Sequence, residues 1–247
     1  MTSLTQDVTK GEIISAYIEA PFDQGKELLE SNKYRLITLE ENAKLRMQEG
    51  AKAYCSINGN WVQEDFIYIK GKGVILPKGY SPICENAEQA TACHKVNKEL
   101  YLTDEQVEKS LANYILLSRN ANNFEIPTND FKNNDIANYI FGKSSEDYGK
   151  FLREAGINNM PLWFANLENK SFARKVWFWY LGDRSDLNGY DKGLGNYYWS
   201  RGVRCEDAIA SEPKKIAEAY TEKQIREALK EANLSEIEKI LFDKLNK

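Results

Sequence analysis

Histidine is nearly missing from this sequence, since His94 is the only one among 247 residues. A single histidine excludes most Ser-His-Asp triads, H-E-x-x-H metallopeptidases and metal centres built from several histidines. Cysteine is also scarce and forms no C-x-x-C pair, so we expect reduced thiols with structural roles. The alternative, a zinc site at Cys84, Cys93 and His94, would need a distant fourth ligand. The sequence therefore predicts no metal and no cofactor.

Positive charge and long apolar runs are lacking as well. Lys and Arg total 33 against 37 for Asp and Glu, which gives a net charge of -4. Without a basic excess, a nucleic-acid partner is not expected. No run of 18 apolar residues occurs, and the first ten residues do not resemble a signal peptide. We therefore predict a cytoplasmic protein that does not insert into membranes.

Capping boxes mark two helices in the first half of the chain. In each, a threonine hydroxyl can accept a helix amide while the Glu or Gln three residues later reaches back. The first box begins at Thr38, and its helix is expected to end near Gly50. The second begins at Thr103, and its apolar spacing predicts a helix through Tyr114 and Ile115.

The remaining pattern mixes helices and strands. Residues 53–76 are predicted to form two or three short strands around the Asn58-Gly59 turn, with Tyr54 and Ile57 in the first of them. Short helices are expected over 128–140 and 144–156. Because there is no βαβ regularity, the sequence predicts an α+β fold.

The last forty residues predict a different structure. Capping boxes begin at Thr221 and Ser235, and each precedes an amphipathic helix. The resulting charged helical hairpin is too short to bury much apolar area alone. We therefore expect residues 214–247 to dock on the main domain, on a second copy or on a partner.

Aromatic residues concentrate between positions 160 and 204, which hold 11 of the chain's 29 Trp, Tyr and Phe. Trp163, Trp177 and Phe178 lie among aliphatic residues and are assigned to the core. In residues 182–200, by contrast, 15 of 19 are Gly, Asp, Arg, Ser, Asn or Tyr. Such a composition favours recognition, because tyrosine offers a large surface with few torsions to freeze.

The same segment alternates two apolar anchors with polar display. Leu187 and Leu194 are predicted to turn into the core. The side chains predicted to face water are those of Asp186, Asn188, Tyr190, Asp191, Tyr197 and Tyr198. An ordinary polar loop without a ligand is the alternative that composition leaves open.

The order of several motifs resembles a known family. Ile126-Pro127-Thr128 is followed by Pro161-Leu162-Trp163-Phe164-Ala165, by the run from Phe172 to Phe178, and by Ser200-Arg201-Gly202-Val203-Arg204. This order resembles C-type lectin-like domains of the formylglycine-generating-enzyme type. The part from Trp177 to Arg204 is similar to the variable region of proteins diversified by retroelements, a group that includes the phage major tropism determinant.

The resemblance implies a C-type lectin-like α+β fold, with short strands and flanking helices, that displays a hypervariable surface. The domains expected are an N-terminal leader at 1–33, the lectin-like domain at 34–207 with its variable region at about 174–204, and a helical tail at 208–247. The implied partner is a macromolecule, most simply a protein. The implied framework is Trp177, Phe178, Leu187, Leu194, Gly202 and Val203. The implied ligand-binding residues are Trp179, Tyr180, Asp183, Arg184, Asp186, Asn188, Tyr190, Asp191, Asn196, Tyr197 and Tyr198.

Other functions fit the sequence less well. The active site of a formylglycine-generating oxidase resembles a copper-binding pair of cysteines near the end of the domain. Here Cys205 is the only cysteine after Cys93. A calcium-dependent lectin would need a Glu-Pro-Asn or Gln-Pro-Asp loop and a Trp-Asn-Asp strand, and none of these strings occurs. No nucleophile lies beside a base, so no enzyme activity is predicted. The main alternative is a structural or assembly protein that binds a fixed partner.

Overall fold

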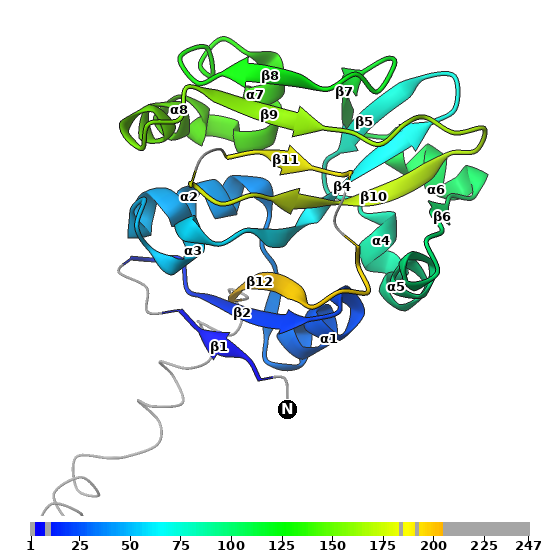
Figure 1. The fold of residues 1–247 in the computed structure, drawn as a ribbon, viewed down its shortest axis with the longest axis horizontal. Coiled ribbons are helices and arrows are strands. Elements are labelled where there is room, and N and C mark those ends of the chain that lie inside the picture. The colour runs from blue at the N-terminus through cyan, green and yellow to red at the C-terminus, as the bar shows by residue number, and fades with distance from the viewer. Residues whose placement is uncertain (1–2, 8–10, 183–184, 191–192, 205–247) are drawn as a thin grey trace, which may run out of the picture. The chain divides into compact units, whose positions relative to one another are not determined.

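The computed structural model describes residues 3–7, 11–182, 185–190 and 193–204 (Figure 1). The predicted helical tail at 208–247, with its hairpin at 214–247, therefore lies outside the described residues. The helices are α1 (Phe22–Ser31), α2 (Leu39–Glu49), α3 (Tyr54–Ile57), α4 (Pro82–Glu85), α5 (Ala87–Lys95), α6 (Asp104–Ser110), α7 (Asp135–Phe141) and α8 (Ser145–Glu154), with a 3-10 turn η1 (Gly142–Ser144). The strands are β1 (Thr5–Gln6), β2 (Ser15–Ala20), β3 (Tyr34–Leu36), β4 (Asn60–Ile69), β5 (Gly73–Pro77), β6 (Leu100–Tyr101), β7 (Tyr114–Ser118), β8 (Phe124–Pro127), β9 (Asn159–Trp163), β10 (Phe172–Phe178), β11 (Leu187–Asn188) and β12 (Tyr198–Arg204).

The strands join into one mixed sheet in the order β1-β2-β12-β4-β10-β11-β9-β8. Strand β3 pairs with β12, β6 with β10, β5 with β4, and β7 with β5. Helix α1 contacts β2, β3 and β12, while α2 contacts α7 and α8. Figure 1 shows β10, β11 and β9 side by side, which places the aromatic segment of the sequence within the sheet.

Strand β4 is buried on both faces because side chains along a strand point alternately to opposite sides. Val62, Phe66 and Tyr68 belong to one hydrophobic cluster. Trp61 and Ile67 belong to the other. The strands β5 and β10 alternate between the same two clusters. The sheet therefore has a core on each face, and β4 and β10 separate them.

The first predicted helix is confirmed in detail. The Thr38 hydroxyl accepts the Glu41 amide at 3.2 Å, and the Glu41 carboxylate accepts the Thr38 amide at 3.0 Å. The helix ends at Glu49 with Gly50 as its C-cap, as predicted. The capping box at Thr103 is also present, but the helix α6 stops at Ser110.

Two expectations about local structure were wrong. Tyr114 and Ile115 lie in β7 and pair with Pro77 and Leu76 of β5, so strand pairing overrides the helical spacing there. Tyr54 and Ile57 bound a short helix rather than a strand. The hairpin forms instead between β4 and β5, and its turn at residues 70–72 contains Gly71, whose φ of +74° suits glycine.

The domain begins earlier than residue 34, where the sequence analysis placed its start. Strand β2 pairs with β12 from Ser15↔Val203 to Ala20↔Tyr198. Phe22 of α1 is fully buried. Residues 15–31, assigned above to a leader, therefore form part of the fold.

Candidate functional site

The aromatic segment is carried by β10, β11 and β12. In β10, Trp177 pairs with Trp61 of β4 on one side and with Asn188 of β11 on the other. Leu187 of β11 also pairs with Leu162 of β9 in parallel. The connection between β10 and β11 and the connection between β11 and β12 thus both begin and end on paired strands.

The two predicted anchors are fully buried, on different faces of the sheet. Leu187 joins the cluster that contains Phe66, and Leu194 joins the cluster that contains Trp61. The Leu194 carbonyl also accepts the Phe22 amide at 2.9 Å. Leu187 therefore fixes β11 between the two connections, and Leu194 fixes the second connection.

A chain of ring contacts runs from the core to the surface. The centroids of Trp61 and Trp177 are 5.0 Å apart, and Tyr198 lies 5.2 Å from Trp177. On the other side, Trp179 lies 6.3 Å from Trp177 and stacks on Tyr180 at 5.6 Å. Trp61 and Trp177 are buried, whereas the other three are half-buried. We call these five residues the aromatic cluster.

Glycine allows this cluster to pack tightly. A Cβ atom at Gly59 would lie 2.6 Å from Nε1 of Trp177, closer than any ordinary contact. The Asn58-Gly59 pair therefore serves a close approach to the indole ring rather than a hairpin.

Two tyrosines and an asparagine extend beyond the cluster into solvent. Tyr190 is 59% exposed and Tyr197 is 63% exposed, and Asn196 is exposed too. The Tyr190 backbone is nevertheless fixed, because its amide donates to Asn188 Oδ1 at 2.7 Å and its carbonyl accepts the Arg174 guanidinium. Exposed rings on a held backbone suit binding, since less conformational entropy is lost.

Asp186 and Asn188 correct the expectation that they face water, because both are buried. The Asp186 carboxylate accepts the Trp163 indole N–H at 3.2 Å, and its carbonyl accepts the Trp179 amide at 2.9 Å. Short polar side chains in a loop look alike in sequence whether they face solvent or bond to the backbone. These two hold the loop in place.

The remaining predicted residues are of three kinds: core residues, residues outside the described part of the chain, and surface residues. Trp177 and Phe178 are buried as predicted, but Trp163 is only half-buried. Asp183, Arg184 and Asp191 lie outside the described residues. The predicted ligand-binding residues that reach the surface are Trp179, Tyr180, Tyr190, Asn196, Tyr197 and Tyr198, which we call the candidate surface.

Sequence reasoning missed Arg46, which is fully buried beneath the same segment. Its guanidinium lies 3.9 Å from the centre of the Phe178 ring and donates to the Phe178 carbonyl at 3.4 Å. It also donates to the hydroxyl of Ser185 at 3.3 Å and that of Tyr148 at 3.4 Å. An arginine in a capped helix normally points to solvent, so no local signal marked this role.

A second missed feature adds α3 to the surroundings of the aromatic cluster. The Leu181 amide donates to the Ser56 carbonyl at 2.7 Å, which brings the connection after β10 against this helix. Tyr54 is 40% exposed and Ile57 is 50% exposed on the same helix. Tyr54 also stacks on Tyr17 at 4.6 Å. Apolar side chains outside the predicted variable region thus lie beside it.

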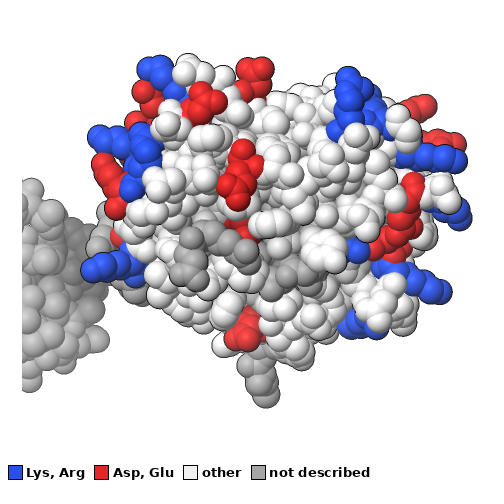
Figure 2. All heavy atoms as spheres, turned by 45° about the horizontal axis from the view of Figure 1, so that its top comes forward, with Lys and Arg blue, Asp and Glu red and all other residues white. Residues whose placement is uncertain are grey.

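Charge is distributed unevenly over the described surface. Figure 2 shows a broad face with few charged side chains, around which Lys, Arg, Asp and Glu gather toward the edges. Interfaces with proteins commonly have aromatic centres and polar rims.

Among the described residues, no three His, Cys, Asp or Glu side chains come together as a metal site would require. Nor does any helix in that part of the chain have the length and apolar character needed to cross a bilayer.

Comparison with known proteins supports the fold. No family model matches the sequence, and no curated protein matches it. A solved structure described as "Accommodation of massive sequence variation in Nanoarchaeota by the C-type lectin fold" matches with a TM-score of 0.58 and 16% identity. The match covers 80% of this chain and 100% of that one. The protein therefore has a C-type lectin fold, as the sequence predicted.

Proposed function

We propose that this protein binds a macromolecular ligand, most simply a protein, through the candidate surface. The main support for this proposal is that buried anchor residues and exposed aromatic residues alternate along one segment. Leu187 and Leu194 are fully buried, whereas Tyr190 and Tyr197 expose more than half of their surface. A scaffold fixed by anchors and β-pairing can present different side chains without refolding.

The rings of the candidate surface supply the binding free energy. Tyrosine and tryptophan dominate protein interfaces, and truncating one at the centre of an interface commonly costs about 2 kcal/mol or more. Trp179 and Tyr180 are already stacked, so they lose little freedom on binding. The fold presents this surface without defining its ligand, which the side chains must select.

We further propose that a retroelement diversifies this surface. The motif order that resembles retroelement-diversified variable proteins, including the tropism determinant, supports this proposal. The solved C-type lectin structure is itself described in terms of massive sequence variation. On this proposal the protein is a receptor-like or adhesin-like binder and not an enzyme, and its C-type lectin fold is of the formylglycine-generating type. The role of residues 214–247 in docking remains a prediction.

Deep sequencing of the gene in its source population tests the diversification. Substitutions are expected at adenines in codons 177–200, concentrated at the candidate surface. Codons for Leu187, Leu194 and residues 201–204 should stay fixed. Uniform, synonymous variation would contradict the retroelement and leave a lectin-like protein with a constant partner.

A paired binding experiment tests the surface itself. The Tyr190→Ala/Tyr197→Ala variant should no longer retain the protein that the wild type captures from a lysate of the source community. Tyr101→Ala is the matched control, since Tyr101 is 45% exposed but lies outside the segment. Equal capture by all three proteins would exclude the candidate surface as the binding site.

A further inference from the structure

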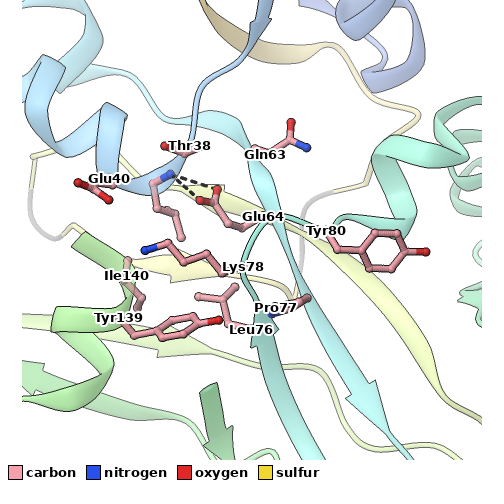
Figure 3. A pocket seen from close by; sticks show the side chains of 12 residues that line it. Thr38, Glu40, Gln63, Glu64, Leu76, Pro77, Lys78, Tyr80, Tyr139 and Ile140 are labelled. Carbon is pink, nitrogen blue, oxygen red and sulfur yellow. Dashed lines mark hydrogen bonds between the residues drawn. The ribbon is translucent and has the colours of Figure 1, made fainter. Parts of the chain in front are cut away.

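A hollow of about 270 Å³ lies between α2, β4, β5 and α7 (Figure 3). No described residue of the candidate surface belongs to its lining. Drug-sized ligands need roughly 300–1,000 Å³, so this space suits a group the size of a side chain. Much of its wall is apolar and is formed by Leu39, Leu76, Pro77, Tyr139 and Ile140.

A carboxylate interrupts this apolar wall. Glu64 is half-buried, and its two oxygens accept the Leu39 amide at 3.0 and 3.1 Å (Figure 3). The two backbone N–H groups beside it, those of Leu39 and of Glu64 itself, do not fill the roughly four acceptor sites of a carboxylate. The carboxylate therefore keeps acceptor capacity for a donor that enters the hollow.

Other charged groups near Glu64 are mostly paired among themselves. Glu40 accepts Lys44 at 2.7 Å, and Lys175 on β10 is bound to Asp65 at 2.7 Å. The titratable groups that face Glu64 from the elements packed around it are Glu40 and Glu41 on α2, Lys78 and Tyr80 after β5, Tyr139 on α7 and Lys175 on β10. The lining of the hollow thus combines two carboxylates, Glu40 and Glu64, with one exposed lysine, Lys78.

The exposed lysine indicates which charge the hollow accepts. Lys78 Nζ lies 5.6 Å from the centre of the Tyr139 ring. Aromatic faces attract cations at this distance. A cation that enters the hollow would occupy the space near Tyr139 that the Lys78 ammonium fills. The positive charge of Lys78 would repel that cation.

We propose that the hollow binds a primary ammonium or guanidinium group on a short apolar stem. The cation donates charge-assisted hydrogen bonds to Glu64, and the stem packs on Leu76, Tyr139 and Ile140. The same chemistry is offered by a free alkylamine and by a lysine or arginine side chain of a partner protein.

Binding is coupled to the proton on Glu64. Burial raises the pKa of Glu64 to about 7, although the Leu39 amide and the Lys175 charge act in the opposite direction. A bound cation favours the ionised carboxylate and releases the proton. Affinity therefore increases with pH, by about tenfold between about pH 6 and about pH 8, in proportion to the ionised fraction.

Isothermal titration calorimetry of the full chain with n-butylammonium and n-butylguanidinium tests this proposal. Glu64→Gln should abolish binding, whereas Lys78→Met should tighten it several-fold because it removes the competing charge. Glu108→Gln, an exposed change outside the lining, is the control and should bind like the wild type. Circular dichroism verifies that each variant is folded.

A second pair of probes identifies the source of the cation. A peptide with an acetylated N-terminus and a free central lysine is the second probe. If it binds and n-butylammonium does not, the cation is a partner's side chain. Binding of n-butylammonium without binding of the peptide would indicate a small metabolite, and either result supports the site. The proposal is overturned if neither probe binds, if folded Glu64→Gln binds normally, or if affinity decreases as pH rises.

Discussion

The rings of Trp177 and Tyr198 lie 5.2 Å apart, although Trp177 is 3% exposed and Tyr198 belongs to the candidate surface. A residue of the core and a residue of the proposed interface are therefore in direct contact. Tyr198 also lies 6.2 Å from the fully buried Trp61. The surface is consequently supported from below by rigid indole rings, which limits the mobility of the contact residues.

The core and exposed aromatics should differ sharply in their effect on stability. Trp177→Ala is expected to lower the free energy of unfolding by about 3–5 kcal/mol, as large core truncations do. Tyr197→Ala should change it by less than about 0.5 kcal/mol, because its ring is mostly exposed. Urea unfolding of both variants measures the difference. Similar values would show that the exposure gradient has no energetic meaning.

Asp186 should behave as a framework residue even though it lies within the predicted variable segment. Asp186→Ala removes the acceptor of the Trp163 indole N–H and should cost about 1–3 kcal/mol. Tyr190→Ala, four residues away and exposed, serves as the control and should cost less than about 0.5 kcal/mol. Chemical denaturation of the two variants separates these roles. A neutral Asp186→Ala would restore it as a display residue.

Lys175 is expected to resist diversification for a similar reason. Its ammonium and the Asp65 carboxylate are 2.7 Å apart, and both side chains are 0% exposed. Lys175→Met should cost about 3–5 kcal/mol, because it leaves Asp65 buried without its cation. The double variant Lys175→Met/Asp65→Leu should recover part of that loss. If both proteins unfold at the same urea concentration, the pair is not the source of the penalty.

His94 allows a direct test of electrostatics, because it is the only histidine. Burial, together with the nearby Arg174 charge, lowers the pKa of His94 from 6.5 to about 4. Its ring signals in proton NMR should therefore show no titration between about pH 7 and about pH 5. Since the neutral ring is favoured in the fold, His94 contributes stability above pH 6.5 that is lost as pH falls toward about 4. Titration near pH 6.5 would contradict its placement.

Glu64 should give the opposite dependence of stability on pH. Its pKa is raised from 4.5 to about 7, so the folded state binds more protons than the unfolded state between these values. The free energy of unfolding should accordingly decrease as pH rises through this window. In Glu64→Gln this contribution should disappear, as a series of urea unfolding curves can show. An unchanged slope would mean that Glu64 is ionised in the fold.

Sequence reasoning predicted the features that depend on local chemistry. The Thr38 and Thr103 caps, the buried Leu187 and Leu194, and the C-type lectin fold were all predicted. It failed where distant segments decide the outcome. Tyr114 entered a strand because β5 was available as a partner, and Asp186 turned inward because Trp163 offers an indole N–H.

The site shows the same limit. Composition identified exposed Tyr190 and Tyr197, yet it gave no reason to suspect Arg46 under the segment or the apolar α3 beside it. These contributions depend on long-range packing, for which one sequence without its fold carries no pattern.

The place of β12 in the sheet also has a consequence for how the protein folds. This strand comes late in the chain, yet it pairs with β2 and β3 and contacts β4, all from the first seventy residues. During synthesis, β2 can pair with β1 at once, but it must wait for β12 until residue 203 has emerged from the ribosome. Closing such long loops slows folding and leaves strand edges unpaired meanwhile. The segment proposed to vary therefore also completes the fold, and under that proposal each new version of the surface would first have to close the sheet.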